Sequence, residues 1–407
     1  MATIAFFAPI GAGHINPTLG LAAELVTRGH RVTYATTEAN AARVAETGAE
    51  IVPWTSTWDS LSLDDVPQMH GKELVRAMGL LLEETLAALP QLDRGQHPDL
   101  VVHDGPLCWW GRILAARWRV PAIETWPNLV SNEHWSMHRE YTTLNPMSFR
   151  FLRVALRLGR LLRAEGLGNL QAFLRGDRAA IRLILLPRAF QYAGETFGDG
   201  FAFVGPGLTG RAFQGEWEPP RDGLPVMLVS LGTGYNNRPD FYRTVLQAAQ
   251  GRPWHVVMAV GGADPSALGQ IPPNVEVHRH VPQLAVLRHA RAFVTHAGMG
   301  STMESLHFGV PMVAVPQMAE QRANADRIAE LGLGRALAPA AVTAAALWQA
   351  VEEVADDPHV RERLRWMQGE LTAAGGARAA ADEVEKVIAE RSVPPRSEPK
   401  AESDNST

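Results

Sequence analysis

The sequence predicts a two-domain α/β protein in which each domain is built on a parallel β-sheet and the two domains face a cleft. A length of 407 residues exceeds what one hydrophobic core usually organises, and it favours two domains. Short β-rich runs alternate with longer helical patterns along the whole chain, which is typical of right-handed βαβ units. This alternation restarts after a segment at 205–225 that is rich in glycine, proline and charge.

The first domain is expected over residues 1–205. It opens with the β-rich run TIAFFAP, the helical pattern NPTLGLAAELVTRG and a second β-rich run, RVTYAT. Residues 206–224 are the expected linker. The second domain, residues 225–376, contains the strand-length runs PVMLVS, WHVVMAV, VEVHRHV, AFVTHA and PMVAVP. A C-terminal helix is expected over 377–392, and the polar tail 393–407 is expected to be disordered because it lacks apolar spacing.

The composition argues against several classes of partner. Hydrophobic residues make up 46% of the chain and charged residues 20%, and the formal net charge is -5, so there is no basic excess to attract nucleic acid. The single cysteine, Cys108, excludes an intramolecular disulfide. The chain does not begin like a signal peptide, and no apolar run approaches the roughly 20 residues that span a bilayer. We expect a cytoplasmic protein with a small-molecule partner.

One stretch interrupts this pattern with an excess of positive charge. In FRFLRVALRLGRLLRAEG, five arginines from Arg150 to Arg163 recur about one helical turn apart. Four apolar residues are expected largely elsewhere around the helix: Phe151, Leu152, Leu156 and Leu162. A solvated helix face explains such a pattern. Peripheral contact with an anionic membrane, where a lipophilic acceptor could be collected, is a second explanation.

The segment HVPQLAVLRHARAFVTHAGMGSTMESLHFGVPMVAVPQMAEQRANA at 280–325 is the strongest candidate site. An apolar strand leads to His296, and a turn with Gly298 and Gly300 opens into a helix expected to begin at Ser301. Glycines let the backbone approach a phosphate, the helix N-terminus supplies free N–H groups, and His296 can donate a further hydrogen bond. Ser301 and Glu304 also fit a capping box that only satisfies the helix end, so the local pattern leaves both interpretations open.

A histidine and an aspartate follow buried-type strands in the first half, where open α/β sheets bind ligands. His14 lies in the turn at 11–17, which precedes a helix with Asn16 as its expected cap and Pro17 as its first residue. Asp104 ends the strand in PDLVVHDGP. A neutral histidine suits a general base for a hydroxyl, and a carboxylate would fix its tautomer and stabilise its protonated form. Each side chain could instead cap its own loop or helix.

Tryptophan is concentrated in the first half of the chain, from Trp54 to Trp135. Each of these side chains alone suits a hydrophobic core, but together they indicate an aromatic and aliphatic pocket over His14 for polyketides, macrolides or polyphenols. The residues expected to line it, chosen from their place near the strand ends, are Met78, Leu82, Trp109, Trp126, Asn132 and Phe149.

With these motifs the chain resembles the nucleotide-sugar glycosyltransferases of the GT-B fold, which has two Rossmann-like domains. The resemblance is to the bacterial macrolide glycosyltransferase group of the UDP-glycosyltransferase family, and it extends over nearly the whole chain. It implies that His14 is the catalytic base, that Asp104 orients it, and that the C-terminal helix crosses back to the first domain.

For the donor, the resemblance implies a distinct role for each part of the second-domain motif. Gln283 and the Val281 backbone would meet the uridine, and Glu304 the ribose hydroxyls. The residues that would hold the diphosphate are His296, Gly298, Gly300 and Ser301, with Thr233 of VSLGTG facing the phosphates. Glu320 and Gln321 would bond the sugar hydroxyls.

Two positions differ from the pattern of the plant UDP-glucosyltransferases, which are relatives of this bacterial group. His280 replaces the tryptophan that stacks on the base, and Gly300 replaces an asparagine in the phosphate turn. A thymidine diphosphate sugar therefore stays open as the donor.

The sequence thus predicts an inverting transfer of a hexose, glucose in the first place, from a UDP-sugar to a hydroxyl of an apolar natural product. No cofactor is expected to stay bound. There is no D-x-D motif and no metal-ligand spacing, so we expect a metal-independent reaction. Drug inactivation, as in antibiotic resistance, and antibiotic biosynthesis both fit such a transfer.

Three alternatives stay open. A nucleotide-sugar epimerase would turn over donor without acceptor, although the apolar first-half pocket argues against it. A hydride-transferring oxidoreductase would need the third glycine of G-x-G-x-x-G, which is absent here although Glu38 stands where its acidic residue is expected. A non-catalytic nucleotide-sugar sensor would not need His14 with Asp104.

Overall fold

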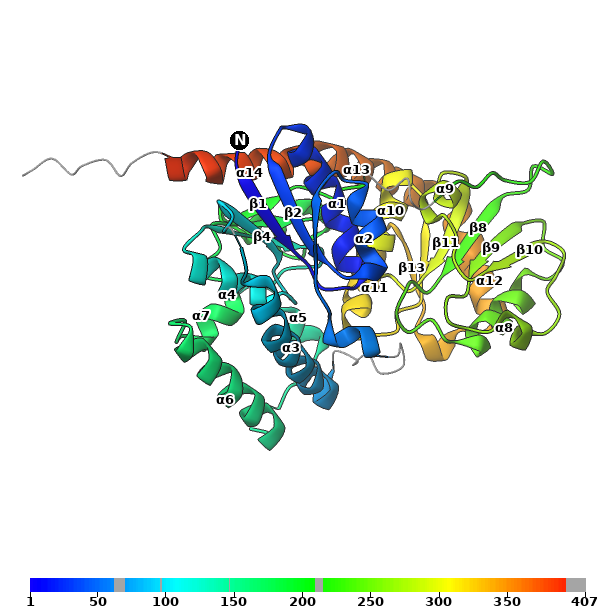
Figure 1. Ribbon diagram of the computed structural model, residues 1–407. Coiled ribbons are helices and arrows are strands. Elements are labelled where there is room, and N and C mark those ends of the chain that lie inside the picture. Colours follow the sequence, from blue (N-terminus) through cyan, green and yellow to red (C-terminus); the bar gives the residue numbers. More distant parts are fainter. Residues whose placement is uncertain (62–69, 96, 146, 209–214, 393–407) are drawn as a thin grey trace, which may run out of the picture.

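The computed structural model describes residues 1–61, 70–95, 97–145, 147–208 and 215–392, without the side chains of 391–392. The expected disordered tail at 393–407 and residues 209–214 of the expected linker lie outside the described residues. Two parallel sheets lie next to each other, each covered by helices (Figure 1). The predicted fold class, two parallel-sheet α/β domains, is confirmed.

The first sheet has seven parallel strands in the order β3-β2-β1-β4-β5-β6-β7. Its strands are β1 (Thr3–Phe7), β2 (Arg31–Thr36), β3 (Glu50–Pro53), β4 (Leu100–Asp104), β5 (Ala122–Trp126), β6 (Ile181–Ile184) and β7 (Phe201–Phe203). Strand β4 is buried along its whole length, as expected for a strand covered by helices on both faces. The strand order reverses between β1 and β4, and in open α/β sheets this switch point is where ligands bind.

The second sheet has six parallel strands in the order β10-β9-β8-β11-β12-β13. Its strands are β8 (Val226–Ser230), β9 (His255–Ala259), β10 (Val275–His278), β11 (Ala290–Thr295), β12 (Met312–Ala314) and β13 (Gly334–Ala336). The order reverses between β8 and β11. The two strands that meet at this switch point therefore lead into the two glycine turns noted in the sequence, VSLGTG and HAGMG.

Helices connect the strands of both sheets (Figure 1). In the first domain they are α1 (Ala12–Thr27), α2 (Glu38–Ala45), α3 (Gly71–Leu92), α4 (Trp109–Trp118), α5 (Met137–Tyr141), α6 (Phe149–Ala164) and α7 (Leu170–Arg175), with the 3-10 turns η1 (Thr57–Ser60), η3 (Arg188–Phe190) and η4 (Gly194–Thr196). In the second half they are α8 (Pro239–Ala249), α9 (Gln283–Leu287), α10 (Met299–Phe308), α11 (Ala319–Glu330), α12 (Ala344–Asp356), α13 (Pro358–Ala374) and α14 (Gly376–Ser392), with η6 (Pro265–Leu268) and η7 (Pro339–Ala341).

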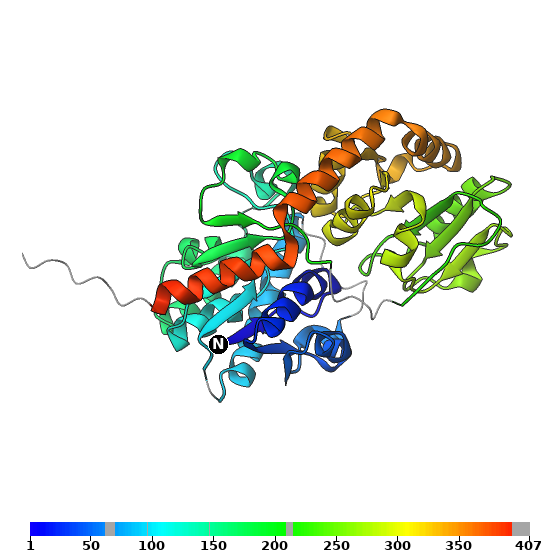
Figure 2. The same ribbon diagram turned by 90° about the horizontal axis from the view of Figure 1, so that it is seen from above.

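The last helix returns to the first domain. Helix α14 packs against α1, and its small apolar residues, including Ala381 and Val384, join the core beside β1. Arg28 at the end of α1 donates hydrogen bonds to Asp382 (2.6 Å) and Glu385 (2.7 Å) of α14. Figure 2 shows this red helix running along the first domain, while α13 stays beside the second.

Two helix starts differ from the sequence-based prediction. Helix α1 begins at Ala12 after Gly11, with no side-chain cap, so Pro17 lies inside the helix and Asn16 is not its cap. Helix α10 likewise begins at Met299 after Gly298, two residues before the expected start. In both cases the chain becomes helical directly after a glycine in extended conformation, so neither side-chain cap is needed. His14 therefore lies in the first turn of α1.

The domains meet through an apolar core and one arginine. A continuous cluster contains Leu129 and Phe190 of the first domain together with Phe293 and Leu306 of the second. Beside it, Arg327 of α11 donates to the carbonyl oxygens of Phe190 (2.9 Å), Ala189 (3.0 Å) and Gln191 (3.1 Å). These charge-assisted bonds fix α11, a helix of the second domain, against the first.

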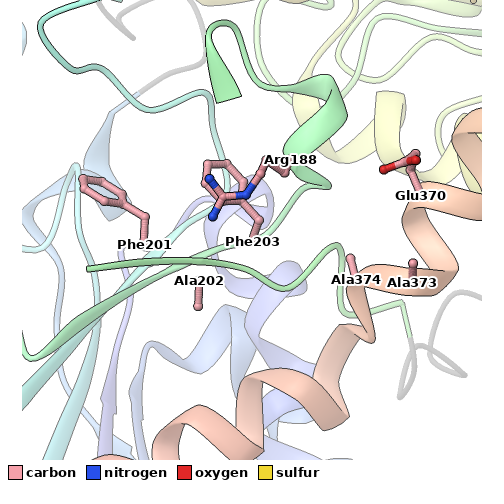
Figure 3. A pocket seen from close by; sticks show the side chains of 7 residues that line it. All are labelled: Arg188, Phe201, Ala202, Phe203, Glu370, Ala373 and Ala374. Carbon is pink, nitrogen blue, oxygen red and sulfur yellow. The ribbon is translucent and has the colours of Figure 1, made fainter. Parts of the chain in front are cut away.

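A cavity of about 270 Å3 lies at this junction, on the outer edge of the first sheet. Figure 3 shows Phe201, Ala202 and Phe203 of β7 on one side and Glu370, Ala373 and Ala374 of α13 on the other. Arg188 lies 4.3 Å over the Phe203 ring, and its Nη1 is bonded to the carbonyl oxygens of Gly194 and Phe197. This cavity contains none of the residues predicted for the active site.

Candidate active site

The first switch point brings His14 and Asp104 together, although they are 90 residues apart in sequence. His14 Nδ1 lies 2.6 Å from Asp104 Oδ2. A carboxylate can only accept this hydrogen bond, so Nδ1 carries the hydrogen and Nε2 is left as the basic atom. The Asp104 side chain is fully buried, whereas 18% of the His14 side chain is exposed, so the ring stays accessible to a substrate.

Asp104 is itself held by the backbone. Its Oδ1 accepts a hydrogen bond from the Leu107 N–H (2.8 Å), so the same carboxylate stabilises the turn before α4 and orients the histidine. Asp104 thus contacts His14 as predicted, whereas the alternative that it caps the following helix is wrong, because the N-cap of α4 is Cys108 and the Asp104 side chain bonds the turn before it. The neighbouring His103 lies in the core and does not contact His14; its Nδ1 is 3.0 Å from the Asp104 carbonyl.

The charges around His14 favour its protonated form. Burial, the largest single influence, lowers the pKa of His14, but the charge and hydrogen bond of Asp104 together with the charge of Glu320 in the second domain outweigh it. The net result is a pKa above the usual histidine value. Glu320 belongs to α11, so its effect on His14 shows that residues of both domains act on one ring.

At the second switch point, His296 is packed between two glycines. A Cβ atom at Gly232 would lie 2.5 Å from the imidazole, and one at Gly298 would lie 2.3 Å from its Nε2, so neither position has room for a side chain unless the ring moves. Burial lowers the pKa of His296 to about 4, although a backbone contact with Ser230 opposes this effect. The ring is therefore neutral at pH 7 and can donate one hydrogen bond to an anion.

Backbone strain occurs in both glycine turns. Among the described residues, four non-glycine residues have positive φ, and two of them are Ala297 (59°) and Tyr235 (53°) in these turns. Ala297 is held by its N–H to Thr295 Oγ1 (3.2 Å) and by Asn324 Nδ2, which donates to its carbonyl (2.9 Å). Such conformations cost about 1–3 kcal/mol and often occur at functional sites.

The predicted nucleoside residues form a small polar network. Gln283 Nε2 donates to Ser301 Oγ (3.1 Å) and to Glu304 Oε2 (2.6 Å), and Glu304 is largely buried. Since α10 starts at Met299, Ser301 lies in its first turn. Its hydroxyl accepts a hydrogen bond from Gln283 and does not cap the helix. The capping-box interpretation of Ser301 and Glu304 is therefore wrong.

The other residues predicted to bind the donor differ in how far they are exposed to solvent. His280 is exposed just before α9, Val281 beside it is half-buried, and Thr233 is exposed in the turn after β8. Gly300 is the second residue of α10, with open space where a Cβ would lie.

Glu320 and Gln321 open helix α11. With its amide oriented to donate, Asn128 Nδ2 lies 3.2 Å from Glu320 Oε1, which joins the loop after β5 to the second domain. Gln321 Oε1 accepts from the Gln317 N–H (2.8 Å), and no residue in the described part of the chain accepts a hydrogen bond from its amide nitrogen. Burial raises the pKa of Glu320, an effect that His14 and Asn324 partly offset.

Three residues of this neighbourhood were not predicted from the sequence: Asn128, Asn324 and Arg327. Asn324 and Arg327 follow Glu320 by four and seven positions on α11, so helical spacing could have indicated a shared face. Asn128 carries no comparable signal, because only the packing of the two domains brings the loop after β5 to Glu320.

The residues predicted to line the acceptor pocket lie in different surroundings. Leu82 and Trp109 are 1% and 4% exposed within the core between α3 and α4, so neither is free to line a pocket. Asn132 is used in a turn, where it accepts from the His134 and Trp135 N–H groups, and Phe149 is 79% exposed at the start of α6. Met78 and Trp126 are partly buried and stay candidates.

The helices α1 and α10 contact each other across the two sheets. His14 lies in the first turn of α1, and the glycine turn after His296 leads into α10, so this contact joins the helix that carries the predicted base to the helix that follows the predicted phosphate cradle. Within the described ranges, no three His, Cys, Asp or Glu side chains are grouped to hold a metal ion. None of the described helices is long and apolar enough to cross a membrane.

Comparison with known proteins agrees with this arrangement. The sequence model of the family described as UDP-glucoronosyl and UDP-glucosyl transferase matches residues 221–368. The chain is 40% identical to demethyllactenocin mycarosyltransferase of Streptomyces fradiae, over 95% of this chain and 87% of that protein. It is 39% identical to oleandomycin glycosyltransferase of Streptomyces antibioticus, over 96% and 92%. The solved structure of the calicheamicin glycosyltransferase CalG4 matches with a TM-score of 0.83 at 39% identity, over 97% and 100%.

Two parallel-sheet domains whose switch points carry a histidine–carboxylate pair and a glycine turn define a glycosyltransferase of the GT-B fold. The chain belongs to the UDP-glucuronosyl and UDP-glucosyl transferase family. Its substrates are a nucleotide sugar and an acceptor.

Proposed function

We propose that this glycosyltransferase moves a hexose, glucose in the first place, from a UDP-sugar to a hydroxyl of an apolar natural product, with inversion and without a metal ion. The observation that carries this proposal is the 2.6 Å contact between His14 and Asp104, beside Glu320 of the opposite domain. It supplies a base that faces a sugar-binding helix.

The reaction follows from these positions. His14 Nε2 takes the proton of the acceptor hydroxyl, and Asp104 stabilises the imidazolium that forms. The acceptor oxygen bonds to the anomeric carbon as the bond to the diphosphate breaks on the opposite face. The leaving diphosphate keeps the electron pair, and the His296 N–H and the free N–H groups of α10 stabilise its charge.

For the nucleoside, we propose that Gln283 and the Val281 backbone meet the base and that Glu304 bonds the ribose. The exposed ring of His280 does not fix the base, so a dTDP-sugar is the second candidate donor. The name of the mycarosyltransferase relative likewise describes transfer of a sugar other than glucose. The names of the compared relatives, which refer to oleandomycin and calicheamicin, support a macrolide or another antibiotic as the acceptor. Drug inactivation and antibiotic biosynthesis both fit such a transfer.

The first test is a mass-spectrometric screen of the enzyme in EDTA, with UDP-glucose and dTDP-glucose against macrolides and flavonoids. We expect one hexose to be added to at least one acceptor, and the rate to be unchanged by EDTA. Loss of turnover in EDTA would contradict charge stabilisation by protein groups alone. Donor consumption without any transfer would favour the epimerase, for which the comparisons offer no support.

A second prediction concerns the packing of His296. In Gly298→Ala the new Cβ atom must displace the imidazole, whose Nε2 lies 2.3 Å from that point. Loss of one hydrogen bond to a charged phosphate should raise the KM for the donor by about 10- to 100-fold. Steady-state kinetics at saturating acceptor measure this. Gly369→Ala on α13, where a Cβ meets open space, is the matched control and should change nothing. An unchanged donor KM in Gly298→Ala would mean that His296 does not hold the phosphate.

A further inference from the structure

Helix α6 (Phe149–Ala164) lies on the outside of the first domain, at the lower end in Figure 1 and away from the second sheet. One side of it packs against α3 through Leu158 and Leu162, which are fully buried. This contact fixes the rotation of the helix about its axis and so decides which residues face outward.

The opposite side exposes large apolar residues. Phe149, Leu152 and Leu156 are 79%, 41% and 57% exposed, and their spacing of three and four residues places them along one line of the helix. Met147, just before the helix, is 78% exposed. We call Met147, Phe149, Leu152 and Leu156 the α6 apolar ridge. Of the apolar residues expected largely away from the arginines, Leu162 is buried, whereas Leu152 and Leu156 are exposed on the outward side.

Positive charge surrounds the ridge. Helix α6 has five arginines and no acidic residue, in a chain whose net charge is -5. Arg157 pairs with Glu83 of α3 (2.6 Å). For the four others, Arg150, Arg153, Arg160 and Arg163, the described part of the chain provides no ion pair, and all four are exposed. At 100° per residue, Arg153 and Arg160 lie within about 60° of the line through Phe149 and Leu156.

The combination of exposed apolar residues and exposed arginines on α6 fits an anionic membrane surface. Apolar side chains on the outer line of a helix, with arginines beside them, are what an amphipathic helix presents when it lies in the interface of an anionic membrane. The arginines meet lipid phosphates while the apolar residues enter the acyl boundary. The helix is too short and too charged to cross the bilayer, and the contact is therefore peripheral.

We propose that the α6 apolar ridge and its arginines form a peripheral docking surface for anionic lipid. The surface belongs to the first domain and leaves the turns at His14 and His296 free. It does not depend on the identity of donor or acceptor. For a lipophilic acceptor that partitions into membranes, docking would bring the enzyme to its substrate.

The test is co-sedimentation of the full chain, without substrates, with equimolar phosphatidylglycerol and phosphatidylcholine vesicles and with pure phosphatidylcholine vesicles. We expect binding to the anionic vesicles only, and weaker binding at high salt. Arg153→Gln/Arg160→Gln should reduce binding about 30-fold, from about 1 kcal/mol per arginine. Leu152→Glu/Leu156→Glu should abolish it. The matched controls, Arg365→Gln and Ile271→Glu, change exposed residues of the second half and should bind as the wild type does.

Equal binding to both vesicle types, no binding to either, or loss of binding in the control variants would overturn the proposal. So would gel filtration showing a wild-type dimer that Leu152→Glu/Leu156→Glu converts to a monomer, because the ridge would then hold a second copy of the chain. Both α6 variants change outward-facing residues. Their thermal unfolding and their transfer to a water-soluble acceptor should match the wild type, which separates docking from the proposed catalytic function.

Discussion

Replacing His14 with alanine should lower kcat for glycosyl transfer by about 100- to 10,000-fold, because the acceptor hydroxyl loses its general base. The donor turn is unaffected, so the KM for the nucleotide sugar should stay close to the wild-type value. Single-turnover transfer, followed by mass spectrometry, measures the chemical step directly. His359→Ala, which removes an exposed histidine at the start of α13, is the matched control.

The pH profile gives an independent test of the same residue. Asp104 and Glu320 raise the pKa of His14 above its usual value of 6.5, and only the neutral ring accepts a proton. The kcat/KM for the acceptor should therefore increase as the pH rises through this elevated pKa, and decrease below it. In Asp104→Asn the largest raising influence is gone, so the inflection should move to lower pH while the maximal rate falls.

A His14→Ala variant that keeps the wild-type rate would exclude the histidine as base. An Asp104→Asn variant with a lower rate but an unmoved inflection would mean that Asp104 acts on the fold of the loop alone.

Replacing Arg112 with alanine should lower the unfolding free energy of the first domain by about 3–5 kcal/mol. Arg112 Nε lies 2.7 Å from Glu124 Oε1 in the middle of β5, where Glu124 is completely buried. Two further bonds of the guanidinium reach the carbonyl oxygens of Phe173 (2.6 Å) and Gly105 (2.8 Å). Without Arg112, the buried carboxylate loses its main partner. Among the described residues it keeps an ion pair with Arg182, 3.6 Å away, and a hydrogen bond from Trp126 Nε1 (3.0 Å).

Denaturant unfolding of the wild type, of Arg112→Ala and of the control variant Arg31→Ala measures the change in unfolding free energy. Arg31→Ala removes an arginine from an exposed pair with Glu50 and should cost less than about 1 kcal/mol. Arg112→Met/Glu124→Gln removes both charges and should recover much of the loss. If Arg112→Ala were no more destabilising than Arg31→Ala, the buried pair would not stabilise the domain. Since Gly105 follows Asp104, we also expect lower transfer activity in Arg112→Ala.

The sequence by itself determined the fold class and the main chemistry-bearing turns. Apolar periodicity is a local property, so alternating strands and helices could be recognised from short windows, and parallel strands place their carboxyl ends on one edge. Placement near the carboxyl ends of buried strands was sufficient to single out three features: Asp104 ends β4, His296 directly follows β11, and His14 lies in the first turn of the helix after β1.

Only the tertiary structure decided which side chains meet and which face water. Trp109 and Leu82 are residue types expected in an apolar pocket, but they lie in the core. The packing of α6 against α3 turns Leu152 and Leu156 outward. Asn128 reaches Glu320, and Arg327 reaches the carbonyl of Phe190 137 residues away. Contacts of such sequence separation depend on how whole helices and sheets pack, and no local pattern specifies that packing.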